Sequence, residues 1–224
     1  MKNENVTIPV SESEEVSGIL SIPDSGAKDT GIIIAHGAGN DMNNSLLEFF
    51  AEGLAEVGYL ALRFNFLYRE QGKNSPDTPD LLYLAWQGAY RFLSEHSEFR
   101  LKRVLAAGKS LGGRIASQMV AEGKLSVERL LFLGYPLHAP GKVDRLRDGH
   151  LYEIPIPMLF FAGARDQFCN LQLLKGVLSH LKAPWTLEII EGGDHSFIIP
   201  KSSEIGQQEV YRRVVGKTLE WLSA

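Results

Sequence analysis

Short apolar runs recur along the chain from residue 30 onward, and each is followed by a segment with a different spacing of apolar positions. Uninterrupted apolar runs of this kind are typical of strands that are buried on both faces of a parallel sheet. The runs that we expect to be strands are Thr30–Ala35, Tyr59–Phe66, Val104–Ala107, Arg129–Leu133, Met158–Ala162 and Thr186–Ile190.

The segments between these runs carry apolar residues at spacings of three and four, which line one face of a helix. Strands that alternate with such helices predict an α/β fold, with a mostly parallel central sheet and helices on both of its faces. The positions that predict helices are Leu46, Phe50, Leu54 and Val57; Leu81, Ala85, Ala89 and Phe92; Ile115, Met119 and Val120; the segment Leu171–Leu181; and Val210, Val214, Thr218 and Leu222.

Four segments fall outside this alternation. Val6–Val10 and Val16–Ile22 alternate loosely, and we expect them to form an antiparallel hairpin at the edge of the sheet. Gln71–Pro79 is polar and predicts a loop. Pro136–Pro157 contains four prolines and predicts a long functional loop or a short excursion, since structureless loops of that length are uncommon. It is too short for a separate lid, so we expect residues 1–224 to form a single domain.

Composition narrows the class of protein. The chain has 224 residues, 44% of them hydrophobic, and a net charge of −4 without a basic stripe, so a nucleic-acid partner is not expected. The one cysteine, Cys169, excludes an internal disulfide framework and a cysteine-cluster metal site. The start of the chain is polar, and the longest apolar stretch, Met158–Ala164, is far short of the ~20 residues that span a bilayer. We therefore expect a cytoplasmic protein with no membrane partner.

The strongest chemical signal is Gly108–Gly112, which reads G-K-S-L-G between an expected strand and an expected helix. That is the context of a nucleophile elbow, in which Ser110 sits on a tight turn and Gly108 and Gly112 leave room for neighbouring chain. A phosphate-binding loop, G-x-x-x-x-G-K-[ST], would overlap the same residues. It requires a glycine where this chain has Arg103, so we reject the nucleotide-binding interpretation.

A serine hydroxyl needs a base, and the base needs an orienting carboxylate. In this strand–helix order the expected sequence is Ser, then Asp or Glu, then His. Asp166 and His195 both follow expected strands, so they lie at the carboxyl edge of the sheet with Ser110. Two alternatives remain open: Asp166 caps the next helix, or the adjacent Asp194 is the acid. His195 could also be a buried structural histidine.

An acyl-transfer intermediate needs donors for its negative oxygen. We expect one donor to be the backbone N–H of Leu111 and the other the N–H of Ala38, with Gly37 allowing the loop to turn. Arg63 and Tyr68 are weaker candidates for substrate binding. A structural ion pair explains Arg63 better than an acidic substrate does, and core or rim packing explains Tyr68 at least as well as an apolar pocket. The remaining histidines show no metal-ligand spacing, so we expect neither a metal nor a cofactor.

Together these residues resemble the α/β-hydrolase superfamily over nearly the whole chain. More narrowly, the chain resembles small bacterial hydrolases related to testis-expressed protein 30 and to a domain of the third regulatory subunit of the NSL chromatin complex. The dienelactone-hydrolase-like branch is similar in size, but it carries a cysteine at the position of Ser110. The matching phrases are Ala35–Gly39, Arg63–Phe66, Gly108–Arg114, Leu133–Lys142 and Gly193–Phe197.

The resemblance implies a Ser-Asp-His hydrolase without a large lid, and it implies no particular substrate. Our leading hypothesis is a serine hydrolase of small-molecule carboxylic esters or thioesters that acts as a monomer or weak homodimer. The alternative is a non-catalytic interaction module on the same fold, because a fold does not guarantee an activity. A third hypothesis is acyl transfer to an acceptor other than water.

Overall fold

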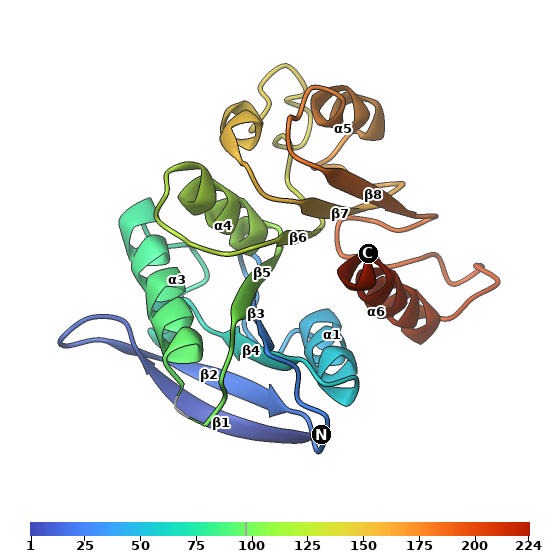
Figure 1. The fold of residues 1–224 in the computed structure, drawn as a ribbon. Helices are drawn as coiled ribbons and strands as arrows, with labels where there is room; N and C mark the ends of the chain where they lie inside the picture. The colour runs from blue at the N-terminus through green and yellow to red at the C-terminus, as the bar shows by residue number, and fades with distance from the viewer. Residues whose placement is uncertain (97) are drawn as a thin grey trace.

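The computed structural model describes residues 1–96 and 98–224, and within them one eight-stranded sheet runs through the molecule (Figure 1). Its strand order is β1-β2-β4-β3-β5-β6-β7-β8. No helix in these described residues is long and apolar enough to cross a bilayer. The strands are β1 (Lys2–Pro9), β2 (Glu15–Ile22), β3 (Thr30–Ala35), β4 (Leu60–Phe64), β5 (Arg103–Lys109), β6 (Leu130–Leu133), β7 (Met158–Gly163) and β8 (Trp185–Ile190).

The first two strands form the expected antiparallel hairpin at the sheet edge. Lys2 pairs with Ile22 at one end of the hairpin and Pro9 with Glu15 at the other. Strand β2 then runs antiparallel to β4, whereas the pairs from β4 through β3 to β8 are parallel. Strand β1 begins earlier than predicted, because its first residues are exposed and polar and carry no apolar signal. The predicted fold class is confirmed.

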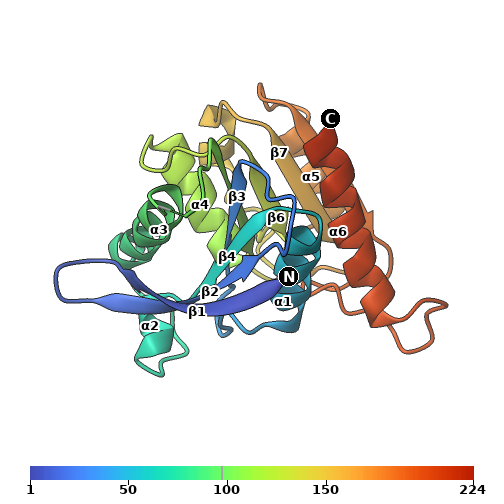
Figure 2. The same ribbon diagram turned by 60° about the horizontal axis from the view of Figure 1, so that its bottom comes forward.

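Helices cover both faces of this sheet, and Figure 2 shows α3 and α4 on one side and α1 and α6 on the other. Each side has its own buried apolar cluster. Neighbouring residues of β5 point to opposite clusters, Ala106 to the first and Ala107 to the second, which is why the central strands read as unbroken apolar runs. The helices are α1 (Ser45–Glu56), α2 (Leu67–Glu70), α3 (Pro79–Ser94), α4 (Leu111–Ala121), α5 (Leu171–Leu178) and α6 (Gln207–Ser223), with a 3-10 helix η1 (Gly149–Glu153).

Several predicted boundaries are wrong. Val57 does not belong to the apolar face of α1: it caps the helix and is 42% exposed, because Gly58 turns the chain at φ +98°. The predicted strand Tyr59–Phe66 ends at Phe64 in the structure. Beyond it, the N–H of Phe66 donates to Nε2 of His36, in the loop after β3. The short helix α2 follows directly and was not predicted. Helix α5 ends at Leu178 instead of Leu181.

The proline-rich segment Pro136–Pro157 is a packed excursion. It contains η1, and its apolar residues Leu137, Leu151 and Ile154 are buried in the cluster beneath α4 and α5. The segment therefore packs on the face of the sheet that carries α4 and α5, and it runs from the carboxyl end of β6 to the amino end of β7.

Two buried histidines fasten the loops at the carboxyl edge of the sheet. The Nδ1–H of His36 donates to the carbonyl of Gly37 (2.8 Å), and its Nε2 accepts the N–H of Phe66 (3.1 Å). His138 repeats the arrangement, with its Nδ1 2.9 Å from the carbonyl oxygen of Ala139 and its Nε2 accepting the N–H of Asn170 (3.0 Å). The first histidine thus joins the loops after β3 and β4, and the second joins those after β6 and β7.

The buried His36 makes the fold sensitive to acid. Burial lowers the pKa of His36 to about 4, whereas the unfolded chain has the ordinary pKa of 6.5. Between these values the unfolded state binds a proton that the folded state does not. We therefore expect the free energy of unfolding to fall as pH drops from 6.5 to 4, by up to about 3 kcal/mol from this residue.

Urea unfolding at pH 7, 5 and 4, followed by circular dichroism, measures this effect. The His36→Gln variant should lose part of the pH dependence, whereas His180→Gln, at an exposed position, should keep it. Equal pH dependence in the two variants would contradict the assignment.

Candidate active site

Ser110 occupies a strained turn between β5 and α4. Its backbone has φ +49° and ψ −113°, a conformation that costs free energy for any residue with a Cβ. The flanking glycines allow it. A Cβ on Gly108 would lie 2.2 Å from the nitrogen of Gly113, and a Cβ on Gly112 would lie 2.6 Å from the carbonyl oxygen of Ala35. The turn therefore exists only because the chain has no side chain at these two positions.

The structure brings the three expected side chains together in one hydrogen-bonded chain. Nε2 of His195 lies 2.8 Å from Oγ of Ser110, and Nδ1 of His195 lies 2.7 Å from Oδ2 of Asp166. The three residues come from the loops that follow β5, β8 and β7. With Nδ1–H donating to the carboxylate, Nε2 has its lone pair directed at the serine hydroxyl.

The acid and the base are each held by further contacts. The side chain of Asp166 is fully buried, and its second oxygen, Oδ1, accepts the N–H of Phe168 at 2.7 Å. The ring of Phe168 packs on the imidazole of His195, with 4.5 Å between ring centroids. At Gly163 a Cβ would lie 2.2 Å from the carbonyl oxygen of Asp194, so the end of β7 and the histidine loop touch backbone to backbone.

The contacts do not fit either alternative that the sequence left open, in which Asp166 caps α5 or Asp194 is the acid. Oδ1 of Asp194 accepts the N–H groups of Ser196 (2.8 Å) and Ile198 (2.9 Å), so this carboxylate shapes its own loop. The cap of α5 is Asn170, whose side chain accepts two N–H groups of the first turn. The geometry therefore places Asp166, and not Asp194, on the ring nitrogen of His195.

The expected oxyanion donors belong to two segments next to Ser110, the start of α4 and the loop after β3. Leu111 is the first residue of α4, where backbone N–H groups have no partner within the helix. Ala38 lies in an exposed turn in which the N–H of Asn40 donates to the carbonyl of Gly37. A Cβ on Gly37 would lie 3.3 Å from the Cβ of Ser110, so this loop passes directly beside the serine.

The structure does not bring Arg63 and Tyr68 to an accessible surface. Arg63 is 1% exposed, and its Nη1 donates to the carbonyl of Met42 at 2.8 Å. Tyr68 is fully buried behind the same loop, with its hydroxyl 3.4 Å from the carbonyl oxygen of Gly37. Both side chains support the loop after β3 from within, so we do not assign them to substrate binding.

Sequence reasoning missed Lys109, which stands next to Ser110 and is 5% exposed. The available signal was a charged residue at the end of an otherwise apolar strand. Its Nζ would lie 3.2 Å from a Cβ on Gly134, beneath the histidine loop. Burial lowers the pKa of Lys109 to about 8, while the charges of Asp166 and Asp194 act to raise it. Among the residues that the structure describes, no carboxylate lies within 4 Å of this ammonium.

The buried ammonium predicts that Lys109→Met stabilises the fold at pH 7. The folded-state pKa of about 8 lies below the ordinary 10.5, so the penalty is fully present below pH 8 and disappears as pH rises toward 10.5. We expect a gain of up to about 3 kcal/mol at pH 7 and a smaller one at pH 10. Urea unfolding at both pH values measures it, with exposed Lys182→Met as the control. A Lys109→Met variant that is less stable than the wild type at both values would refute the prediction.

Solved structures share this fold. Dienelactone hydrolase from Anabaena variabilis is 21% identical, with a TM-score of 0.75 over 99% of this chain and 97% of that one. An α/β serine hydrolase homologue from Coxiella burnetii is 20% identical, with a TM-score of 0.77 over 99% and 98%. The esterase domain of a Rhodothermus marinus protein is 18% identical, with a TM-score of 0.73 over 99% and 98%. At these identities the likeness establishes the fold alone.

Curated relatives from two strains of Mycobacterium tuberculosis are 26% identical over 207 residues and carry the provisional name phosphoribosyl transferase. The match covers 91% of this chain but 44% of those proteins, so the chain spans less than half the length of the curated relatives that it matches.

The family model described as "Alpha/beta hydrolase domain" matches residues 28–223. That range runs from just before β3 to the end of α6 and includes the loops that carry Ser110, Asp166 and His195. The chain therefore belongs to the α/β-hydrolase family.

Proposed function

We propose that this chain is a serine hydrolase that cleaves carboxylic ester or thioester bonds of a small-molecule substrate. The observation that carries the proposal is the hydrogen-bonded chain from Ser110 through His195 to Asp166, with both links shorter than 3 Å. Three side chains from three separate loops meet in the order that nucleophilic catalysis requires. The family and the names of several fold relatives, which include esterases, agree with this reaction class.

In the first half of the proposed reaction, Oγ of Ser110 attacks the substrate carbonyl carbon and forms a C–O bond. Nε2 of His195 accepts the hydroxyl proton as the bond forms. The buried carboxylate of Asp166 holds the ring and stabilises the imidazolium cation. The tetrahedral intermediate then collapses, His195 gives its proton to the leaving alcohol or thiol, and an acyl-enzyme remains.

We assign stabilisation of the negatively charged intermediate to two backbone N–H groups, those of Leu111 and Ala38. The N–H of Leu111 belongs to the first turn of α4, where the helix dipole also favours negative charge. The N–H of Ala38 is the proposed second donor. One such donor contributes roughly 3–4 kcal/mol in the transition state. In the second half of the proposed reaction, water attacks the acyl carbon while Nε2 of the neutral His195 accepts its proton. The bond from the acyl carbon to Oγ then breaks, His195 returns the proton to Oγ of Ser110, and the carboxylic acid leaves.

The finer features of the proposal concern relatives, assembly and location. We infer that the chain works as one domain over residues 1–224, as a cytoplasmic monomer or weak homodimer. Its phrases Ala35–Gly39 and Leu133–Lys142 support a place among the hydrolases related to testis-expressed protein 30 and the NSL subunit. The name of the mycobacterial relatives describes proteins more than twice as long as the matched region, so we do not transfer phosphoribosyl transfer to this chain.

Labelling with a fluorophosphonate probe tests the proposed nucleophile. We expect stoichiometric labelling at Ser110, located by peptide mass spectrometry, because Nε2 of His195 is in place to accept the serine proton. The Ser110→Ala and His195→Ala variants should not be labelled. On a p-nitrophenyl ester, Ser110→Ala should lower kcat by about 10³-fold to 10⁶-fold, as for other nucleophile losses. His180→Ala is the matched control, because it removes an exposed histidine from another part of the surface.

Two results would redirect the proposal. If Ser110 stays unlabelled while a control hydrolase reacts, the serine is not activated, and the interaction-module hypothesis becomes the leading one. If the acyl-enzyme forms but added alcohols or amines compete efficiently with water, acyl transfer replaces hydrolysis.

A further inference from the structure

Lys109, the residue before Ser110, turns its long side chain into the protein instead of into solvent. It is the last residue of β5 and is buried. Its Cγ would lie 3.5 Å from a Cβ on Gly37, in the loop after β3, and its Nζ would lie 3.2 Å from a Cβ on Gly134, in the loop after β6. Strands β3 and β6 are the two neighbours of β5, so this side chain packs against the loops on both sides of its own strand.

Gly134 brings the ammonium of Lys109 close to the imidazole of His195. The same Cβ on Gly134 would lie 3.6 Å from Cε1 of His195 and 2.9 Å from its carbonyl oxygen. Glycine is also the residue that φ of +78° favours at this position. Both Nζ and the imidazole therefore border a space that stays open because Gly134 has no side chain.

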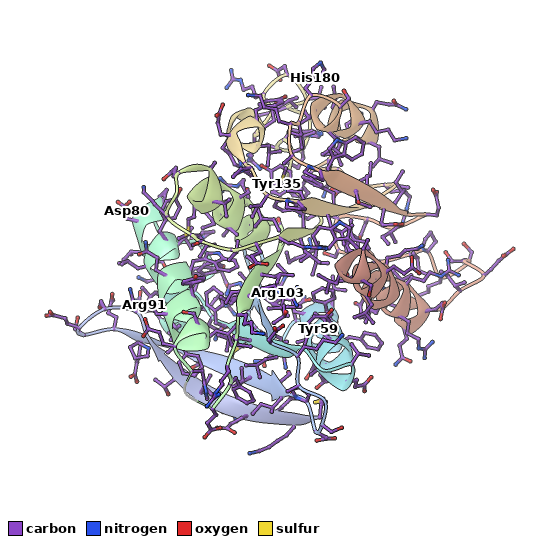
Figure 3. The ribbon with its side chains drawn as sticks, in the orientation of Figure 1. Tyr59, Asp80, Arg91, Arg103, Tyr135 and His180 are labelled. Atoms are coloured by element: carbon purple, nitrogen blue, oxygen red, sulfur yellow. The ribbon has the colours of Figure 1, made fainter. Side chains whose placement is uncertain are left out.

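The loop that contains Gly134 is anchored at two successive residues. The N–H of Gly134 donates to the carbonyl of Phe161, in β7, at 3.0 Å. Figure 3 shows the next residue, Tyr135, inside the molecule next to α4, where its hydroxyl donates to the carbonyl of Arg147 at 2.5 Å. The fold therefore sets the spacing between the ammonium and the imidazole before a substrate binds.

His195 lies between charges of opposite sign. Oδ2 of Asp166 is 2.7 Å from Nδ1 of His195, and the charges of Asp166 and Asp194 both act on Lys109. Carboxylates attract a proton to the imidazole, and a ring that is already protonated at Nε2 cannot accept the proton of Ser110. The ammonium opposes this attraction, because a positive charge disfavours a second one beside it. Burial lowers the pKa of Lys109 to about 8, so the group remains mostly charged at pH 7.

Other titratable groups of the surrounding loops do not supply this charge. Burial lowers the pKa of His36 to about 4 and raises the pKa of Tyr135, so both are neutral near pH 7. Arg165, in the loop of the proposed acid, is exposed, and its Nε donates to a carbonyl of the histidine loop. Water and salt screen an exposed charge, whereas they screen a buried one much less. Lys109 therefore has the stronger effect on the ring.

We propose that Lys109 is a positioning residue of the active site, whose ammonium holds His195 in the neutral form that accepts the proton of Ser110. This inference rests on the proposed hydrolase function and adds a residue to it. Lys109 acts through the imidazole and not on the substrate. The role also accounts for a buried cation that by itself weakens the fold, because strain and unfavourable burial persist at sites where they serve the reaction.

The pH profile of ester hydrolysis tests this role. Lys109→Met removes the charge and keeps a side chain of similar length. We expect the acid limb of kcat/KM on a p-nitrophenyl ester to move to higher pH by about one unit, because the carboxylates are then unopposed. On that limb kcat/KM should be about 10-fold below the wild type at the same pH, and above it the two should agree within about 3-fold. Lys109→Arg should keep the wild-type limb, because it restores the positive charge.

Proton NMR gives a second reading that needs no substrate. In protein with isotope-labelled histidine and the Ser110→Ala substitution, the Cε1 proton of His195 reports the protonation of the ring. The midpoint of its titration should move to higher pH when Lys109→Met is added. The matched control is Lys182→Met, which removes an exposed lysine and should change neither the acid limb nor the NMR midpoint.

The two readings separate failure of this role from failure of the function. If the ester is hydrolysed and Lys109→Met moves neither the acid limb nor the NMR midpoint, the positioning role is wrong and the hydrolase proposal stands. Equal loss of kcat/KM at every pH in Lys109→Met and Lys109→Arg would assign the residue to packing and also overturn the role. If no ester is hydrolysed and the fluorophosphonate leaves Ser110 unlabelled, the function is overturned, and the NMR midpoint alone decides whether Lys109 acts on His195.

A folding defect is distinguished by stability. Lys109→Met is expected to be more stable than the wild type at pH 7, so a slower reaction on the acid limb in a more stable protein cannot come from unfolding. Should Lys109→Met fail to fold, Lys109→Gln removes the same charge and decides the same questions.

Discussion

The close approach of α4 to the strands beneath it is the constraint on which the rest of the site depends. Gly108 and Gly112 leave space for backbone alone, and that space lets Ser110 adopt a left-handed conformation at the tip of β5. The first N–H of α4 and the loop after β3 then meet at the same serine. Strain at this residue is sustained by the buried parallel strands on either side, which hold the turn from both directions.

Hydrogen bonds between loops complete the geometry that bonds within each loop begin. In His36 and His138, Nδ1 bonds the carbonyl of the next residue, and Nε2 accepts an N–H from a neighbouring loop. His36 lies beside the proposed oxyanion donors and His138 beside the loop of Asp166. Phe168 then packs on His195 from the loop that carries the acid. The residues that position Ser110, Asp166 and His195 thus come from several loops at this edge. The sequence of a single loop therefore shows little of how the site is held together.

The strands and the order of the three candidate catalytic residues could be predicted because they depend on local pattern and on chain order. Ser110, Asp166 and His195 each follow a strand of the same parallel sheet, so topology alone brings them to one edge. Roles that depend on tertiary burial could not be predicted. Arg63 looked available for substrate, yet it is buried against a loop, and Lys109 looked like an ordinary motif residue, yet it is withdrawn from water. Val57 fits a helical spacing, but α1 ends at Glu56 and the chain turns at Gly58.

The distribution of charge around Ser110 follows from the same topology. Lys109 is the last residue of β5, directly before Ser110, and its buried ammonium lies near Gly134, beneath the loop that carries His195. This cation is withdrawn from water and lacks a close carboxylate among the described residues, so it weakens the folded state. A negatively charged intermediate at Ser110, as in the proposed reaction, would form next to this desolvated cation. Because the ammonium is held in place before the reaction, it would need no reorganisation as that charge forms, and its cost to folding would be offset by attraction for the anion.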